Sequence, residues 1–416
     1  MKHDNTNRPA ASAIRPAAPE DSSSAEHGET ALAGQSSDTG GKLPVFERAA
    51  AYALRQIDAG LDTFGPCAYP APSSIGGVYP AISNFEWTSG FWTGMLWLAY
   101  ELTAEPKYRR AAESQLPDYR LRLDERIGTN THDLGFLYSL SAVNEYRITG
   151  NPKAREAGLI AADLLAGRYL PQAGIIQAWG DLNDPSERGR MIIDCLLNLP
   201  LLYWAGAETG DPRYAQYALS HARQSARYLV RPDRTTYHTY YMDAETGRPK
   251  FGTTHQGHAD DSCWARGQAW GIYGFMLSDR YAGGSEFRET AQSLADYFAE
   301  RTPEDGVVYW DLAFKEGREQ ERDSSASAVA ACGLLELARR LPPGSSQSRS
   351  AERRALDILA ALDADYTTRD LPGSNGILKH GVYNKPRGIG IDECTIWGDY
   401  YYFEALVRVL KPDWQP

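Results

Sequence analysis

The stretch Leu134–Leu170 decides the fold, and it reads LGFLYSLSAVNEYRITGNPKAREAGLIAADLLAGRYL. Its first part, Leu134–Thr149, is largely apolar, which is typical of a helix that is buried on all sides. A Gly-Asn-Pro turn follows, and Pro152 stands where proline is favoured, just inside a helix start. From Lys153 onward, apolar residues recur at helical spacing with charges between them. The stretch therefore predicts a hairpin of one buried and one half-exposed helix.

The same helical hairpin recurs along the chain, and repetition of this kind decides architecture before any single motif does. A sixth apolar helix is expected at the C-terminus, where it has no following partner. An amphipathic helix near the N-terminus can take that place and close a ring. The further copies begin at Ser89, Asp194, Arg266 and Ser325, the sixth apolar helix is Trp397–Leu410, and the helix that closes the ring is Phe46–Gly60.

Six helices that need burial on every side, and six that need it on one side, predict an all-α fold, the (α/α)6 barrel. We expect residues 43–416 to form this barrel as a single domain. Residues 1–42 are rich in Ala, Ser, Pro, Gly, Asp and Glu, and we expect them to be a disordered tail. The 416 residues are long enough for one large toroid.

Composition limits the classes of partner. A formal net charge of −11 without a basic run argues against nucleic acid, because nothing could replace the counterions of the phosphates. Residues 1–42 contain no apolar run long enough for an export signal or a membrane span. The five cysteines are scattered without a pairing or metal-binding pattern, which fits a reducing compartment. We therefore expect a cytoplasmic protein with no membrane partner.

All inner helices of such a barrel begin at the same end, because alternate helices run antiparallel. The residues just before those helices must converge on one mouth. Asp and Ser are also ordinary helix caps, and Asp323 is expected to be one. Helix capping does not explain two of the carboxylates as well, because Asp133 follows His132 and Asp194 follows the apolar run Met191–Ile193. The converging residues are Trp87, Ser89, His132, Asp133, Asp194, Trp264, Arg266, Asp323, Ser325, Asp392 and Trp397.

The two carboxylates indicate acid–base chemistry. Burial raises the pKa of a carboxyl group toward the useful range, and a second carboxylate nearby raises it further. Asp194 is thus the candidate acid, and Asp133 is its neighbour across the mouth. A carboxylate pair in a sugar-binding mouth is typical of a glycosidase. The sequence does not give the separation that would distinguish a retaining from an inverting reaction.

The block Gln256–Trp270 combines two indole rings, a guanidinium and two carboxamides, a mixture that suits an acidic sugar. Trp264 and Trp270 offer faces that can stack on pyranose rings, and Arg266 offers a fork that can hold a carboxylate by two parallel hydrogen bonds. Aromatic residues also fill cores, and more often than they bind sugars. His238, in an aromatic run, is either a partner of the sugar or a solvated strand residue.

The chain carries no spacing typical of metal ligands, no GxSxG elbow and no Gly-rich phosphate loop. We therefore expect no cofactor and no metal. The weaker alternative is a metal site made of histidines whose spacing matches no standard set, namely His132, His238, His255 and His258.

Five motifs carry a resemblance to a known family. They are WTSGFW at 87–92, HDLGF at 132–136, Asp194 at the start of its apolar helix, DSCWARGQAW at 261–270 and DECTIWGDY at 392–400. With these motifs in this order, and over essentially all of residues 43–416, the chain resembles the unsaturated glucuronyl hydrolases of glycoside hydrolase family 88.

The resemblance implies an enzyme that releases 4,5-unsaturated glucuronic acid from the non-reducing end of lyase-generated glycosaminoglycan oligosaccharides of chondroitin, hyaluronan or heparin type. It implies hydration of the C4=C5 enol ether, with Asp194 matching the general acid and base and Asp133 the second essential carboxylate. Trp179 and Tyr383 enter through the resemblance alone. The positions that it places around the substrate are Trp87, Trp179, His238, Gln256, Trp264, Arg266, Trp270 and Tyr383.

Three other functions stay open at this stage. A related hydrolase of unsaturated rhamnogalacturonan shares the fold and the chemistry, but the block Trp264–Trp270 weighs against it. A sugar epimerase would abstract protons with His rather than with paired Asp. A non-catalytic sugar-binding toroid would not need a buried Asp194.

The preference for sulfated substrates is open as well. Family members that favour 6-sulfated substrates resemble one another in a Ser-x-x-Ser-x-Lys segment, and this chain has Asn384–Ile389 in its place. Lys385 and Arg387 either meet a sulfate group or belong to a solvated basic loop.

Overall fold

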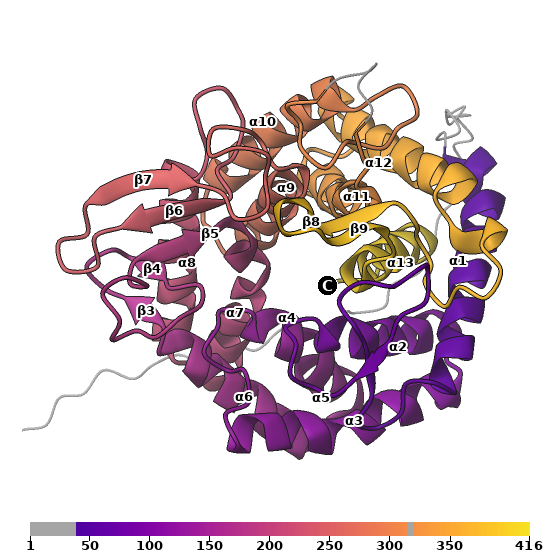
Figure 1. Ribbon diagram of the computed structural model, residues 1–416, viewed down its shortest axis with the longest axis horizontal. Coiled ribbons are helices and arrows are strands. Elements are labelled where there is room, and N and C mark those ends of the chain that lie inside the picture. Colours follow the sequence, from indigo (N-terminus) through magenta and orange to yellow (C-terminus); the bar gives the residue numbers. More distant parts are fainter. Residues whose placement is uncertain (1–38, 315–319) are drawn as a thin grey trace, which may run out of the picture. The chain divides into compact units, whose positions relative to one another are not determined.

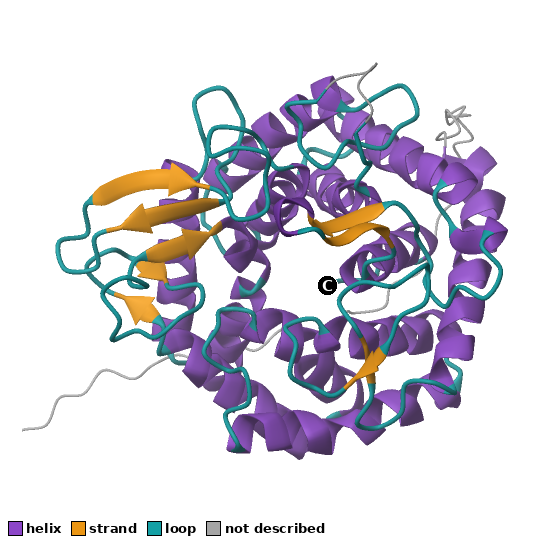
Figure 2. Ribbon diagram, viewed as in Figure 1, coloured by secondary structure: helices purple, strands orange, loops and turns teal. Residues whose placement is uncertain are grey.

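Helices form two concentric rings in the unit that spans residues 41–416 (Figures 1 and 2). The computed structural model describes residues 39–314 and 320–416. The inner ring consists of α2 (Ser89–Thr103), α4 (Leu134–Tyr138) with α5 (Asn144–Thr149), α7 (Leu199–Thr209), α9 (Ala265–Asp279), α11 (Ser324–Arg340) and α13 (Ile396–Leu410). The outer ring consists of α1 (Thr39–Leu61), α3 (Pro106–Asp124), α6 (Pro152–Ala166), α8 (Pro212–Tyr228), α10 (Glu286–Arg301) and α12 (Ser346–Asp365).

The inner ring closes on itself. Helix α2 contacts α13 on one side and α4 on the other, and the contacts continue through α7, α9 and α11 back to α13. Each inner helix from α2 to α11 is followed in the chain by its outer partner. Among the described residues no helix follows the last inner helix, α13, and the outer helix α1 precedes all the inner helices. The fold is the (α/α)6 barrel that the repeats predict. Of the tail predicted at residues 1–42, residues 1–38 lie outside the described residues. Helix α1 begins at Thr39, whereas the sequence predicts a start at Phe46.

Two inner helices differ from the continuous helices that the sequence predicts. Between α4 and α5, the residues Ser139–Val143 form a turn of π-helix. The helix expected from Asp194 begins as the 3-10 helix Ile193–Leu197, and regular α-helix starts only at Leu199. Pro200 explains this break, because it has no N–H to continue the hydrogen-bond ladder of the preceding turn.

Short antiparallel sheets lie at the end of the barrel at which the inner helices begin. The largest has the order β5 (Arg190–Ile192), β6 (Thr239–Met242), β7 (Pro249–Thr253). Strand β5 runs directly into the turn that carries Asp194, and the backbone N–H of Ile193 bonds to the carbonyl of His238, 3.1 Å away. The sheet therefore places His238 beside Asp194. The other pairs are β1 (Tyr69–Pro70) with β2 (Ala81–Ile82), β3 (Tyr169–Leu170) with β4 (Ile175–Ile176), and β8 (Gly381–Asn384) with β9 (Ile389–Glu393).

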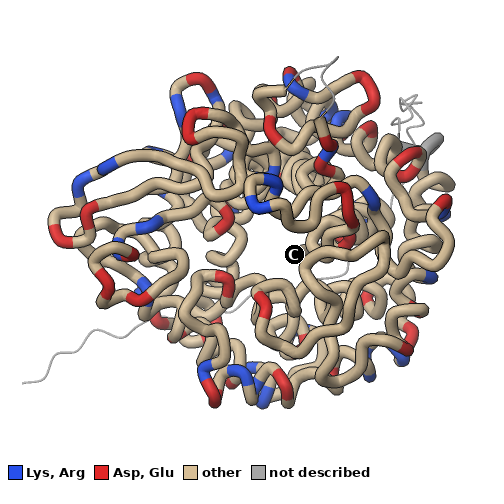
Figure 3. Tube along the Cα trace, viewed as in Figure 1, with Lys and Arg blue, Asp and Glu red and all other residues tan. Residues whose placement is uncertain are grey.

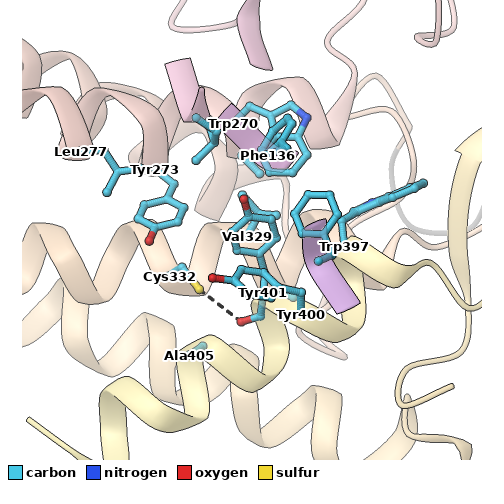
Figure 4. Packing of buried hydrophobic residues seen from close by; sticks show 14 of the residues in the cluster. Phe136, Trp270, Tyr273, Leu277, Val329, Cys332, Trp397, Tyr400, Tyr401 and Ala405 are labelled. Atoms are coloured by element: carbon cyan, nitrogen blue, oxygen red, sulfur yellow. Dashed lines mark hydrogen bonds between the residues drawn. The ribbon is translucent and has the colours of Figure 1, made fainter. Parts of the chain in front are cut away.

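Aromatic side chains fill the inside of the inner ring (Figure 4). The ring of Trp270 lies 5.6 Å from that of Phe136 and 5.4 Å from that of Tyr401, measured between centroids. Charged residues lie mostly on the outer helices and loops (Figure 3). The inner ring buries an ion-paired cluster, in which Arg408 lies 2.9 Å from Glu336 and 2.8 Å from Glu404. The burial pattern thus follows the apolar and amphipathic pattern of the sequence.

Two glycines let the inner helices approach closely where these helices begin. A Cβ atom on Gly90 of α2 would lie 2.0 Å from the carbonyl oxygen of Phe136. A Cβ atom on Gly135 of α4 would lie 2.3 Å from the Cα of Asn198. Both obstacles are backbone atoms and cannot rotate away. The amide oxygen of Asn198 also accepts the N–H of Phe136 at 2.7 Å, so this contact is both tight and directional.

We predict that Gly135→Ala destabilises the barrel by about 2 kcal/mol or more, because an overpacked core must shift its backbone. Chemical denaturation would measure the loss. Gly283→Ala is the matched control, since a Cβ atom there would meet nothing within 4 Å. Equal stabilities of the two variants would contradict the proposed role of the close helix contact.

Candidate active site

The structure brings Asp133 and Asp194 together around one imidazole. His132 Nε2 lies 3.4 Å from Asp133 Oδ1 and 3.5 Å from Asp194 Oδ1. One oxygen of each carboxylate and the imidazole nitrogen all lie within 4.8 Å of one another. The imidazole is buried, whereas the side chains of Asp133 and Asp194 keep 14% and 16% of their surface exposed. The two carboxylates therefore form a close pair that solvent, or a substrate, can still reach.

The position of Asp133 in the chain is that of a helix cap, but its side chain does not cap α4. It accepts a hydrogen bond from Thr131 Oγ1 at 2.6 Å, and the backbone N–H of Asp133 donates back to that oxygen at 3.2 Å. The N–H of His132 donates to the carbonyl of Ala178 at 2.7 Å. These bonds hold the segment before α4 in one conformation and leave the second oxygen of Asp133, Oδ1, beside His132 Nε2.

The environments of the two carboxylates differ. Burial raises the pKa of Asp133 to about 6, against the lowering effects of the Thr131 hydrogen bond and of the positive charges of Arg122 and Arg168. Burial raises the pKa of Asp194 well above its ordinary value, and the charge of Asp133 raises it further. A shared proton therefore favours Asp194, although the two groups titrate as a pair.

The imidazoles near this pair are neutral. Burial, followed by the charge of Arg168, lowers the pKa of His132 to about 3. The pKa of His238 is also lowered, first by burial and then by neighbouring positive charges. His238 Nδ1 accepts the backbone N–H of His255 at 2.9 Å, which leaves the proton of the neutral ring on Nε2. That Nε2 has no hydrogen-bond partner among the described residues.

One interpretation from the sequence needs correction: the fork of Arg266 is not available to a substrate carboxylate. Its Nη1 donates to Asp323 Oδ2 at 2.8 Å and to the Val382 carbonyl at 2.5 Å. Its Nη2 donates to Gln256 Oε1 at 2.8 Å and to the Tyr383 carbonyl at 2.7 Å. All four terminal N–H groups are thus used inside the protein. Arg266 instead holds Gln256 and the backbone of β8 in place.

A second correction concerns Trp270, which is only 1% exposed. Its ring packs in the core with Phe136 and Tyr401, so the predicted stacking of a sugar on it is not possible in this structure (Figure 4). Trp264 is buried to a similar degree, and its ring lies 4.5 Å from the ring of His238 and 4.5 Å from the guanidinium carbon of Arg266. A contact of the Trp264 indole with a substrate stays a prediction.

The other predicted aromatic residues lie nearer to solvent. Trp87 is partly exposed, and its Nε1 donates to the hydroxyl of Tyr383 at 3.0 Å. Trp179 is also partly exposed, with the guanidinium carbon of Arg190 at 4.8 Å from its ring centre and the ring of His255 at 5.3 Å. Trp87, Trp179 and Tyr383 therefore keep surface that a sugar ring could contact.

The structure places the remaining residues predicted for the mouth in three different settings. Asp323 caps α11, as expected, by accepting the N–H of Ser325 at 3.1 Å. Trp397 and Ser89 are fully buried. Asp392 is largely exposed and lies beside the ring of His380.

Among the described residues, the set whose ligand atoms are close enough for a metal ion is His132, Asp133 and Asp194. A metal there would require Asp194 in its ionised form. The four histidines of the alternative metal site do not come together as a group, because His258 packs against Trp310 and Phe314.

Sequence reasoning missed several residues that shape this site. Thr131, Arg122 and Arg168 surround Asp133, and Arg190 contacts Trp179. Each stands in an ordinary polar or amphipathic segment, so no local pattern sets it apart. Only the fold brings these residues to the carboxylate pair.

Comparison with known proteins gives a consistent set of matches. The family model of Glycosyl Hydrolase Family 88 matches residues 76–384. The chain is 47% identical to the unsaturated glucuronyl hydrolase of Bacillus sp. strain GL1, over 88% of this chain and 97% of the relative. It is 45% identical to the unsaturated chondroitin disaccharide hydrolase of Streptococcus pyogenes, over 88% and 90%. The crystal structure of unsaturated glucuronyl hydrolase from Streptococcus agalactiae superposes with a TM-score of 0.87 at 44% identity, covering 90% of this chain and 93% of that one.

The raised pKa of Asp194 predicts a dependence of stability on pH. Between the unfolded pKa, near 4, and the raised folded value, the unfolded chain loses its proton while the folded chain keeps it, so stability falls as pH rises. Asp194→Asn removes the ionisable group. We therefore expect the difference in Tm between variant and wild type to shift in favour of the variant from pH 4 to pH 8. A difference that stays constant with pH would show that Asp194 ionises normally.

Proposed function

This chain belongs to glycosyl hydrolase family 88, and on that basis we propose that it releases 4,5-unsaturated glucuronic acid from the non-reducing end of glycosaminoglycan oligosaccharides made by lyases. The chain is a glycoside hydrolase. The observation that carries the proposal is the carboxylate pair, in which Asp194 is poised to hold a proton and Asp133 to lose one. An enol ether needs such a proton donor, because its carbon accepts a proton before water can add.

Asp194 would donate its proton to C4 of the unsaturated ring, and the positive charge that develops would be shared between C5 and the ring oxygen. The ionised Asp194 would then accept a proton from a water molecule as its oxygen bonds to C5. The resulting hemiketal opens by breaking the bond between C5 and the ring oxygen, and the new C1 hemiacetal expels the remaining sugar. One water is consumed, and Asp194 ends with its proton restored.

Asp133 would stay ionised, accept hydrogen bonds from ring hydroxyls and favour the protonated form of its partner. The spacing fits this division of roles. Oxygens of Asp133 and Asp194 lie within 4.8 Å of each other, whereas the carboxyl groups of inverting glycosidases are about 6.5–9.5 Å apart. That spacing is shorter than the separation typical of direct inversion.

The surroundings of the pair suit a uronic acid. Trp87, Trp179 and Tyr383 offer partly exposed aromatic surface, which pairs with the apolar faces of sugar rings. The Nε2–H of His238 and the carboxamide of Gln256 offer neutral donors to the carboxylate or hydroxyl groups of the sugar. An enzyme of this family from Streptococcus agalactiae has been crystallised with dGlcA-GalNAc6S, a related ligand class.

Sulfate recognition is not assigned to Lys385. Its ammonium group pairs with the carboxylate of Glu321, so of the two cations in that loop Arg387 is the more available one. Membership of a hydrolase family rules out the epimerase and the non-catalytic toroid that the sequence left open. No helix among the described residues is long and apolar enough to cross a membrane. The cytoplasmic location stays a prediction.

We predict that Asp194→Asn lowers the rate of disaccharide hydrolysis at least ~10²-fold, because a positioned general acid commonly supplies that much. Loss of the ultraviolet absorbance of the enol ether, followed with unsaturated chondroitin, hyaluronan and heparin disaccharides, measures the rate. Asp124→Asn, on the outer helix α3, is the matched control and should keep the wild-type rate. Failure of the wild type on every disaccharide would reject the substrate class, and full activity of the Asp194 variant would reject the acid.

The pH profile of kcat/KM should be bell-shaped. Asp133 must be ionised and Asp194 protonated, so the rate falls as pH drops through about 6 and falls again above the raised pKa of Asp194. Both limbs report the coupled pair rather than single residues. A profile that is already flat below pH 5, with no acid limb near pH 6, would be incompatible with this assignment.

A further inference from the structure

A buried arginine links two segments of the active site. Arg168, in the turn between α6 and β3, is 3% exposed. Its Nε donates to the carbonyl of Gln177 at 2.9 Å, and its Nη2 donates to the carbonyl of Gly180 at 3.1 Å. Its Nη1 donates to the side-chain oxygen of Asn130. The guanidinium thus contacts the segment before α4 and the segment after β4 at the same time.

These two segments carry functional side chains of the proposed reaction. Asn130 is followed by Asp133, and the Gln177–Gly180 segment carries Trp179. The backbones also pair directly, with a β-bridge between Thr131 and Trp179 and a bond of 2.7 Å from the N–H of His132 to the Ala178 carbonyl. Arg168 stands at the end of this pairing. Its planar fork can satisfy both segments, which a shorter or single-point donor cannot.

We propose that Arg168 is a positioning residue of the reaction, which fixes the segment bearing Asp133 against the segment bearing Trp179 and supplies a positive charge beside Asp133. The inference rests on the proposed function and deepens it. Among the described residues Arg168 forms no ion pair, and neither does the buried Arg122, whereas the buried Arg266 and Arg408 both do. What sets Arg168 apart is that it bonds to both segments of the site at once.

Electrostatics support this role. Among the nearby charges, that of Asp133 does most to favour the charged form of Arg168, and Arg168 in turn lowers the pKa of Asp133. Burial lowers the pKa of Arg168 to about 10, which still leaves it protonated at neutral pH. Losing this charge would make Asp133 harder to ionise. The titratable and charged groups that act on or face Asp133 are His132, Asp194, Cys195, Tyr383, Arg122 and Arg168.

Three variants separate the charge from the geometry. Arg168→Gln removes both, so the acid limb of kcat/KM should move up by about one pH unit and KM should rise roughly threefold as Trp179 loses its support. Arg168→Lys keeps the charge without the fork, so the limb should stay while KM rises. Asn130→Ala keeps the charge and removes only the link to the Asp133 segment, and it should also raise KM without moving the limb. Asn130 is exposed, so this variant tests the proposal even if the others fold poorly.

Arg339→Gln is the matched control. Arg339 also clamps two backbone carbonyls, those of Trp414 and Arg408, both at 2.9 Å. Its loss should lower Tm but leave KM and the acid limb unchanged. The proposal is overturned if Arg168→Gln and Asn130→Ala behave like this control.

Hydrogen exchange separates this inference from the proposed function. Mass spectrometry of the full-length wild type and of Arg168→Gln should show faster amide exchange in the variant at both 130–133 and 177–180. That readout needs no substrate. An inactive wild type would reject the proposed function but not the link, whereas unchanged exchange in both segments would reject the link even in an active enzyme.

Discussion

The backbone contact between Gly135 and Asn198 is the constraint on which the site depends. It brings the start of α4 against the turn before α7, and the Asn198 side chain fixes the approach by accepting the N–H of Phe136 and donating to the carbonyl of Asp194 at 3.3 Å. Asp133 precedes Gly135 by two residues, and Asp194 precedes Asn198 by four. Any side chain larger than hydrogen at Gly135 would separate these helices and with them the two carboxylates. The same contact therefore closes the inner ring and sets the spacing of the site.

Once the carboxylates are close, their unequal surroundings decide which one keeps the proton. Asp133 accepts a hydrogen bond from Thr131 and has two arginines near it, and all three favour the charged form. Asp194 follows a buried strand, and its Oδ1 has no hydrogen-bond partner among the described residues. Two residues of the same type can thus take different roles in one reaction. Burial, hydrogen bonding and nearby charge together give the two carboxylates different tendencies to hold a proton.

The fold was predictable because it depends on patterns that repeat along the chain. Apolar helices that alternate with amphipathic ones define the two rings, and the antiparallel order brings Asp133 and Asp194 to the same end. Which side chains pair with one another was not predictable in this way. Arg266 looked free in the sequence, yet Asp323, a residue that the sequence marks only as a helix cap, pairs with it at 2.8 Å. In the sequence Arg168 is an ordinary charged residue after an outer helix. Its contacts could not be predicted, because its partners come from two segments, one of them about 38 residues away in the chain.

The pairing of Arg266 with Asp323 also bears on how an acidic protein could take an acidic sugar. An unpaired cation in the mouth would attract the carboxylate of the substrate, but it would equally favour the ionised form of Asp194 and remove the proton that the reaction needs. Pairing Arg266 with a buried carboxylate reduces its effect on Asp194 while its N–H groups still orient Gln256. Neutral donors such as His238, kept uncharged by burial, can hold the anion without that penalty. Pairing Arg266 with Asp323 thus makes recognition of the acid compatible with retention of the proton on Asp194.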